Sequence, residues 1–96
     1  LHGGAIAVLA DTACGLGTFG NLPEGVANFF TVESKCNHLG AVRDGVLECT
    51  ARARHLGRST QVWDAEVTES ATGKLIAMFR CTQMLLREAP AGGTAA

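Results

Sequence analysis

One carboxylate stands out in an otherwise apolar stretch of this 96-residue chain. Apart from His2, Asp11 is the only acidic or basic residue between Leu1 and Pro23. Apolar residues occupy every face of this stretch at helical spacing, which predicts a helix that is buried all round. A buried carboxylate is costly unless it is hydrogen-bonded, paired or reached by water, so an acid kept there is a candidate for chemistry. The alternative is an acid that faces a solvent gap or an Asn or Ser partner.

Two glycines, Gly3 and Gly4, stand where this helix would begin. A helix N-terminus presents N–H groups without helical partners and a partial positive charge. Such donors could form an oxyanion hole for a carbonyl oxygen that gains negative charge in a transition state. Glycine also lets a substrate approach the backbone closely. The simpler interpretation is a tight turn into the helix, and the two interpretations are compatible.

The elements that must position these residues are one helix followed by four strands. The helix is expected over about residues 4–18, and strands are expected at 26–39, 46–55, 59–68 and 74–87. The strand at 46–55 alternates apolar and polar residues cleanly, which is typical of a half-buried antiparallel strand. We expect the four strands to be joined as a meander. A curved antiparallel sheet wrapped around a central helix would bury the apolar helix, and this predicts an α+β fold.

Composition limits the classes of protein that fit. The chain is 47% hydrophobic and 18% charged, which predicts one globular domain over residues 1–87 and a disordered tail at 88–96. The net charge of -1 and the absence of a basic run disfavour nucleic-acid binding, and we expect no membrane span. So short a chain buries a modest core, so oligomerisation is expected.

The four cysteines form no C-x-x-C pair. We therefore expect reduced thiols in a cytoplasmic protein and no zinc site. No signal peptide is visible, but the chain begins at Leu1 rather than Met, so we expect that its natural N-terminus has been lost. Trp63 and Phe79 are expected to pack in the core. His38 and His55 are expected to be structural or exposed, and Arg52 and Arg54 to form a solvated face.

The order of elements and a set of short motifs resemble the hotdog-fold acyl-CoA thioesterases of the phenylacetate-degradation type. The resemblance covers about residues 1–86. The motifs are Leu1-His2-Gly3-Gly4, Leu9-Ala10-Asp11-Thr12-Ala13-Cys14-Gly15, Phe30-Thr31-Val32-Glu33 with Asn37-His38-Leu39, His55-Leu56-Gly57-Arg58-Ser59-Thr60, and Thr72-Gly73-Lys74-Leu75-Ile76-Ala77. It implies a hotdog fold. It also implies a further N-terminal strand or hairpin, and a polar site residue upstream of the histidine, which we expect to be missing here.

The resemblance also implies roles for individual residues. Asp11 would act as general base on water or as nucleophile on the thioester. The Gly3 N–H would stabilise the oxyanion, while His2 and Gly4 would line the site. Thr31 would cross a dimer interface, face the helix acid of the other chain and help hold the attacking water. A β-branched residue in a strand is the structural alternative for Thr31.

A turn later in the chain would bind the substrate's coenzyme A. By resemblance, Gly57, Arg58, Ser59 and Thr60 contact its nucleotide or pantetheine part, and the planar charged fork of Arg suits phosphate. On composition alone, an exposed turn Arg is usually just solvated. The resemblance implies no metal or redox cofactor, and a homodimer paired into a tetramer.

The expected activity is hydrolysis of an acyl-CoA to a free acid and CoA. One alternative is a hotdog module that binds acyl-CoA without hydrolysing it. A hotdog dehydratase is a lesser alternative, because no histidine is suitably placed beside Asp11. Aryl-acetyl, benzoyl-type and medium-chain acyl groups all stay open.

Overall fold

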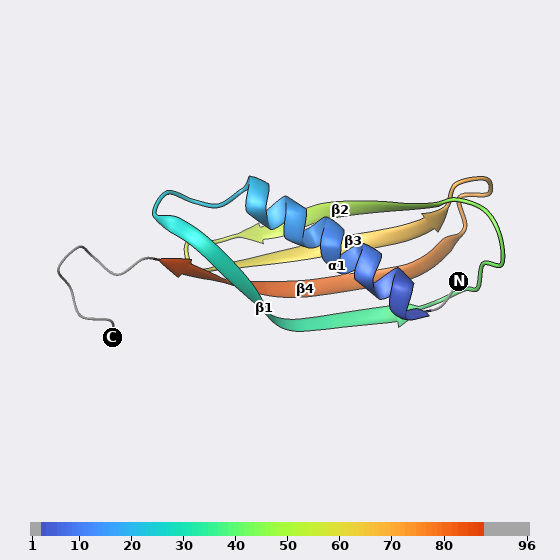
Figure 1. Cartoon of the computed structure of the whole chain (residues 1–96), viewed down its shortest axis with the longest axis horizontal. Helices are drawn as coiled ribbons and strands as arrows, with labels where there is room; N and C mark the ends of the chain where they lie inside the picture. The colour runs from blue at the N-terminus through green and yellow to red at the C-terminus, as the bar shows by residue number, and fades with distance from the viewer. Residues whose placement is uncertain (1–2, 88–96) are drawn as a thin grey trace.

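The computed structural model describes residues 3–87, which form one helix and four strands (Figure 1). Each element begins and ends within two residues of its predicted bounds. The predicted tail at 88–96 and His2 lie outside the described residues. The elements are α1 (Gly3–Gly20), β1 (Val26–His38), β2 (Leu47–Leu56), β3 (Thr60–Glu69) and β4 (Leu75–Arg87). The predicted α+β arrangement of a helix against an antiparallel sheet is confirmed.

The strand order is β1-β4-β3-β2, and every pairing is antiparallel. The predicted meander is therefore correct for β2, β3 and β4 but wrong for β1, which pairs with β4 at the opposite edge from β2. The connection after β1 crosses the end of the sheet instead of forming a hairpin. The N–H groups of Leu39 and Gly40 both donate to the carbonyl of Ile76 in β4, and Val42 is buried in the core. The sequence Asp44-Gly45 would favour a tight hairpin turn here, but burial of this connection outweighs that local preference.

The core lies between α1 and the inner face of β2, β3 and β4. The helix buries every fourth residue on one face, and β3 and β4 bury alternate residues, as the periodicity of a strand predicts. Gly17 lets the helix approach closely, because a Cβ there would lie 2.6 Å from the ring of Trp63. Trp63 and Phe79 pack in this core as predicted. The buried helical residues are Ile6, Ala10, Cys14 and Thr18.

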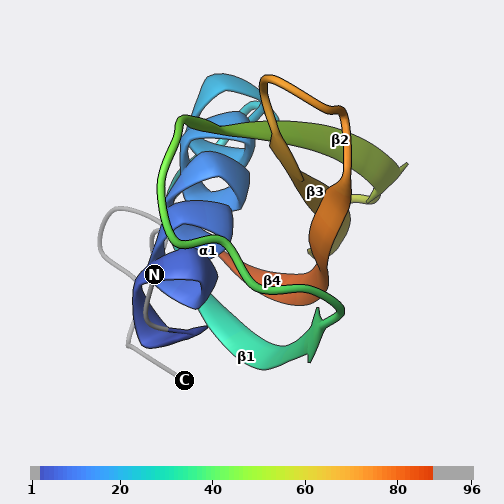
Figure 2. The same cartoon turned by 90° about the vertical axis from the view of Figure 1, so that its right-hand side faces the viewer.

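The expectation of a helix buried on all sides is wrong for the single chain. Figure 2 shows α1 against one side of a curved sheet, and Val8, Leu16 and Phe19 are 65%, 68% and 71% exposed. The physical reason is that four strands of one chain cover only one face of a helix. By length and composition alone α1 could cross a membrane, which corrects the expectation that no segment has this property. Its buried stripe is nevertheless that of a core helix, and the absence of a membrane partner stays a prediction.

Candidate functional site

Asp11 lies in the middle of α1 with its side chain in solvent. It makes no ion pair with any residue from 3 to 87. For the single chain, the structure therefore favours the acid that faces solvent over the buried acid. On one flank of α1, Leu9 lines a small hollow together with Leu47 of β2. Asp11 follows Leu9 by two residues, which is about 200° around a helix, so it lies on the other flank, toward β1.

The inner face of β1 is the part of the sheet that α1 leaves largely uncovered. From Thr31 to the end of the strand, four of its residues stand opposite buried residues of β4 in the strand register, and so point to the same side as the helix. Three are exposed and Cys36 is half-buried. These residues are Thr31, Ser34, Cys36 and His38. We call them, together with Asp11, the open flank.

The helix runs along this inner face from one end of the sheet to the other. At its start, Gly3 lies against His38, because a Cβ on Gly3 would be 3.3 Å from the imidazole. At its far end, Nε2 of Gln61 in β3 donates to the carbonyl of Asn21, just after the helix, over 2.9 Å. The helix N-terminus therefore marks the end of the sheet where β1 finishes.

Within one chain, Asp11 is level with Ser34 and Cys36. Cys14, one turn after Asp11, shares a hydrogen bond with Cys81 of β4. Cys81 is paired in register with Ser34. Asp11 lies one turn nearer the helix N-terminus than Cys14. Along the strand direction it therefore falls between the levels of Ser34 and Cys36. The hydrogen bond with Cys81, and burial, raise the pKa of the Cys14 thiol.

The structure does not bring Gly3 and Asp11 together in one chain. They are eight residues apart on the same helix, which corresponds to about 12 Å along its axis. In addition, the N–H groups of the first turn point away from the helix, beyond its N-terminal end. An oxygen bound to the Gly3 N–H would therefore lie even farther from Asp11.

Thr31 lies at the opposite end of β1 from Gly3. His38, which contacts Gly3, pairs with Ala77, whereas Thr31 pairs with Gln83. These two β4 positions are six residues apart, or about 20 Å along a strand. One chain therefore cannot present both Gly3 and Thr31 to the same carbonyl group.

A row of polar side chains that the sequence reasoning missed supports Thr31. The Thr31 hydroxyl donates to Oε1 of Gln83 over 2.6 Å, and the Gln83 side chain is fully buried. Gln61, paired with Gln83 in register, accepts a hydrogen bond from Nε1 of Trp63. Two glutamines at inward positions of neighbouring strands were the available signal. Hydrogen bonds of these glutamines link the Thr31 hydroxyl and the end of the helix to the core.

The turn that was predicted to bind CoA connects β2 to β3. The Gly57 N–H donates to the carbonyl of Thr60 over 2.9 Å, and a Cβ on Gly57 would collide with that carbonyl and with the His55 ring. Arg58 and Ser59 are exposed. The guanidinium of Arg87 reaches the Arg58 carbonyl over 3.2 Å, which adds a second cation that the sequence reasoning missed. Gly4, the second residue of α1, is exposed.

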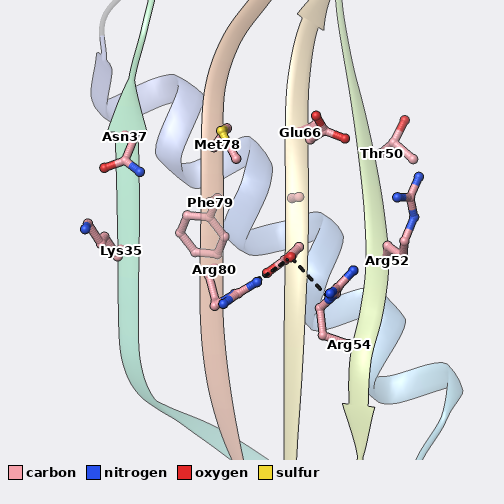
Figure 3. Close-up of a pocket in the computed structure, with 11 residues that line it drawn as sticks. Lys35, Asn37, Thr50, Arg52, Arg54, Glu66, Met78, Phe79 and Arg80 are labelled. Atoms are coloured by element: carbon pink, nitrogen blue, oxygen red, sulfur yellow. Dashed lines mark hydrogen bonds and ion pairs between the residues drawn. The ribbon is translucent and has the colours of Figure 1, made fainter.

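A hollow with a volume of about 480 Å³ lies on the outer face of the sheet, away from Asp11 (Figure 3). There Asp64 accepts two hydrogen bonds from Arg80, over 2.5 and 2.8 Å, and Arg54 lies 3.7 Å away. Arg54 is therefore partly paired rather than simply solvated. The hydrogen bond from Arg80 holds the pKa of Asp64 below its usual range. This hollow contains none of the residues predicted for catalysis.

No cluster of three or more metal-ligating side chains occurs among residues 3–87. The four cysteines lie in helix or strands and form no disulfide among the described residues, and their reduced state in the cell stays a prediction. His38 and His55 are exposed, which the sequence analysis allowed. The acid, hydroxyl and backbone N–H groups located above are candidates for chemistry among residues 3–87.

Comparison with known proteins identifies the family. The model of the thioesterase superfamily matches residues 1–76. A 1,4-dihydroxy-2-naphthoyl-CoA hydrolase of Listeria monocytogenes is 40% identical over 83 residues, which are 85% of this chain and 65% of that protein. A thioesterase structure from Haemophilus influenzae is 32% identical with a TM-score of 0.83, over 91% of this chain and 59% of that one.

A Bacillus halodurans protein solved with CoA is 28% identical, with a TM-score of 0.79 over 93% of this chain and 58% of that one. The chain thus spans less than two thirds of the length of these relatives. Both the family match and the shared helix-on-sheet architecture support the resemblance to hotdog-fold thioesterases inferred from the sequence. The chain belongs to the thioesterase superfamily and has its hotdog fold.

Proposed function

We propose that the protein is an acyl-CoA thioesterase that converts an acyl-CoA and water into a free acid and CoA. The observation that carries this proposal is Asp11, an exposed carboxylate without an ion partner among the described residues, on a helix that is otherwise apolar. Relatives named as a CoA-ester hydrolase and a thioesterase, and a neighbour solved with CoA, support the same chemistry.

The reacting centre in this proposal combines two copies of the chain. Because Gly3 and Asp11 of one chain are about 12 Å apart and its first-turn N–H groups point away, one copy cannot use both on one carbonyl. Asp11 of one copy therefore works with the Gly3 N–H of its partner. In the copy that supplies Gly3, Thr31 lies about 20 Å along the sheet from that Gly3 and donates its hydroxyl hydrogen to Gln83, so we propose that the centre uses Asp11 and Gly3 without Thr31 of that copy.

The free edge of β1 is where a second copy fits. Among the described strands β1 pairs only with β4, so the backbone groups of its other side are available for another strand. Phe30 and Val32 of β1 are about half exposed, which adds apolar surface there. Pairing of two β1 strands about a two-fold axis is antiparallel, so each helix N-terminus lies beside the partner's helix. We propose a homodimer of this kind.

The outward face of α1 supports a further pairing of dimers. It exposes Val8, Leu16 and Phe19, and the helix carries no charged residue except Asp11. Burial of such a face on assembly is favourable, at about 25 cal/mol per Å² of apolar surface. We propose that the protein functions in the cytoplasm as a dimer of dimers.

The chemistry then needs only groups that the chain supplies. The carbonyl oxygen of the thioester accepts a hydrogen bond from Gly3, which stabilises the negative charge of the tetrahedral intermediate. Asp11 removes a proton from the attacking water, or attacks the carbonyl carbon and is later released by water. The C–S bond breaks and CoA leaves as its thiolate. Arg58, with Gly57, Ser59 and Thr60 of the same turn, holds the CoA.

The test is CoA release from a panel of thioesters by the full-length protein. The panel contains phenylacetyl-, benzoyl-, 1,4-dihydroxy-2-naphthoyl-, hexanoyl- and palmitoyl-CoA, read with a thiol-reactive dye. The Asp11→Asn variant gives the background from the four protein thiols. Turnover confined to the protein with Asp11 supports the proposal and narrows the acyl class. Tight acyl-CoA binding without CoA release would contradict it in favour of a non-catalytic binding module.

A further inference from the structure

At the level of Asp11 in its own chain, the inner face of β1 carries two small residues. Ser34 and Cys36 lie on the inner face of that strand, opposite Cys81 and Phe79 of β4. Along the strand direction, Asp11 lies between the levels of these two residues. Since α1 leaves β1 largely uncovered, this surface is open on the side that Asp11 faces.

These two residues differ from the buried residues that lie under the helix at the same level of the sheet. Cys36 packs against the core cluster but stays half-buried, and Ser34 is exposed. The Ser34 hydroxyl has no hydrogen bond with another described residue, in contrast to Thr31 on the same face, which is bonded to Gln83. The surface therefore has an apolar floor, one free hydroxyl and no bulky side chain.

We propose that Ser34 and Cys36 contact the acyl group of the substrate and limit its width. This inference rests on the proposed thioesterase function. The thioester carbon must come within about 3 to 3.5 Å of the attacking oxygen that Asp11 supplies or activates, so the acyl group begins beside Asp11. Ser34 and Cys36 are the inward β1 residues at that level. Their small size leaves room for an aromatic ring, which a larger side chain at either position would occupy.

Alkylation of Cys36 tests the contact without relying on turnover. Cys49 on β2 is a matched control, because it is also a half-buried strand cysteine whose pKa is raised by burial, but it lies on the far side of α1. The full-length Asp11→Asn variant is treated with N-ethylmaleimide, with phenylacetyl-CoA at ten times its Kd or with CoA alone, and each thiol is followed by mass spectrometry.

Phenylacetyl-CoA should slow the modification of Cys36 about tenfold and leave Cys49 unchanged, whereas CoA alone should protect neither thiol. Binding of phenylacetyl-CoA that leaves the Cys36 rate unchanged would overturn the inference while the proposed function stands. Absence of binding by phenylacetyl-CoA and by every other thioester of the panel would overturn both. Equal protection of Cys36 and Cys49 would also overturn it, because that result reports a global change rather than a contact.

Substitution of Ser34 tests the limit on width. Ser34→Leu should lower kcat/KM for phenylacetyl-CoA at least tenfold more than for hexanoyl-CoA, because the branched side chain fills the space of the ring. Ser34→Ala should keep the wild-type preference. Asn37→Leu, on the outer face of the same strand, controls for effects of an added leucine on β1. Equal losses on both substrates with Ser34→Leu would contradict the inference, and the alkylation assay decides it if that variant does not fold.

Discussion

The two flanks of α1 have different surroundings. On one side the helix packs on β2, β3 and β4, where Gly17 lets Trp63 approach and the interior is almost wholly apolar. On the other side it carries Asp11 above an uncovered strand with hydroxyl, thiol and imidazole groups. The comparison shows that one chain completes a core but not a reaction centre. The core residues pack on one another within the chain, whereas Gly3 and Asp11, which are proposed for the chemistry, lie about 12 Å apart in it.

The first prediction separates the two possible duties of Gly3, as a helix start and as a hydrogen-bond donor. Gly3→Pro removes the N–H but keeps the helix, because proline is tolerated in the first turn. We expect kcat to fall by about 100-fold or more, the usual cost of losing one oxyanion donor. The measurement is steady-state CoA release.

Gly3→Ala is the control, since it keeps the N–H and only brings a methyl group to 3.3 Å from the exposed His38 ring. Its kcat should stay within a few-fold of wild type. Equal activity of the proline and alanine variants would show that the Gly3 N–H takes no part in catalysis.

A second prediction compares two glycines of α1 by stability. A Cβ at Gly17 would lie 2.6 Å from Trp63, so Gly17→Ala should destabilise the fold by about 1 to 3 kcal/mol. At Gly15 a Cβ would meet nothing within 4 Å, so Gly15→Ala should stabilise it by up to about 1 kcal/mol through helix propensity. Urea unfolding measures both. The same sign for both substitutions would contradict the packing described for Trp63.

The third prediction, with the smallest effect, concerns Asp64 on the outer face of the sheet. Asp64 is ion-paired, whereas Asp11 makes no ion pair with a described residue. The native pKa of Asp64 is lowered by Arg80, so the unfolded state binds more protons in the acidic range and stability rises with pH there. The contribution is present at neutral pH and is lost as pH falls below about 4, through the lowered native pKa. Asp64→Asn should therefore cost at most about 1 kcal/mol at pH 7 and less at pH 3.

Thermal unfolding of wild type and Asp64→Asn at several pH values checks this prediction. CoA release should be unaffected, because Asp64 lies on the other face of the sheet from Asp11. A stability difference that does not change between pH 7 and pH 3 would show that the ion pair is not its source.

Local patterns predicted the elements well because each carries its own periodicity. Alternation placed Leu47, Cys49, Ala51 and Ala53 toward the core, and the structure agrees. Pairing of β1 with β4 escaped prediction, because strand order depends on burial of the connection through Val42 and not on local turn residues. The buried row of Gln61 and Gln83 likewise depends on a register that spans distant parts of the chain.

The individual residues of the site could be predicted from the sequence, but their arrangement in space could not. Asp11 stood out by its charge in an apolar stretch, and Gly3 by its place at a helix start. Their separation along one helix, and the distance of Thr31 from Gly3, appear only when helix rise and strand register are combined. Arg87 joined the predicted CoA turn for the same reason, since it is 29 residues from Arg58 in sequence.

The most direct test of the account is the rate of CoA release by wild type, Asp11→Asn and Glu24→Gln, with thermal stability measured in parallel. Glu24→Gln is the matched control, an exposed acid in the turn before β1. We predict loss of nearly all turnover in Asp11→Asn with unchanged stability and CoA binding, and normal turnover in Glu24→Gln. Near-normal turnover by a folded Asp11→Asn variant would contradict the central claim that Asp11 performs the chemistry.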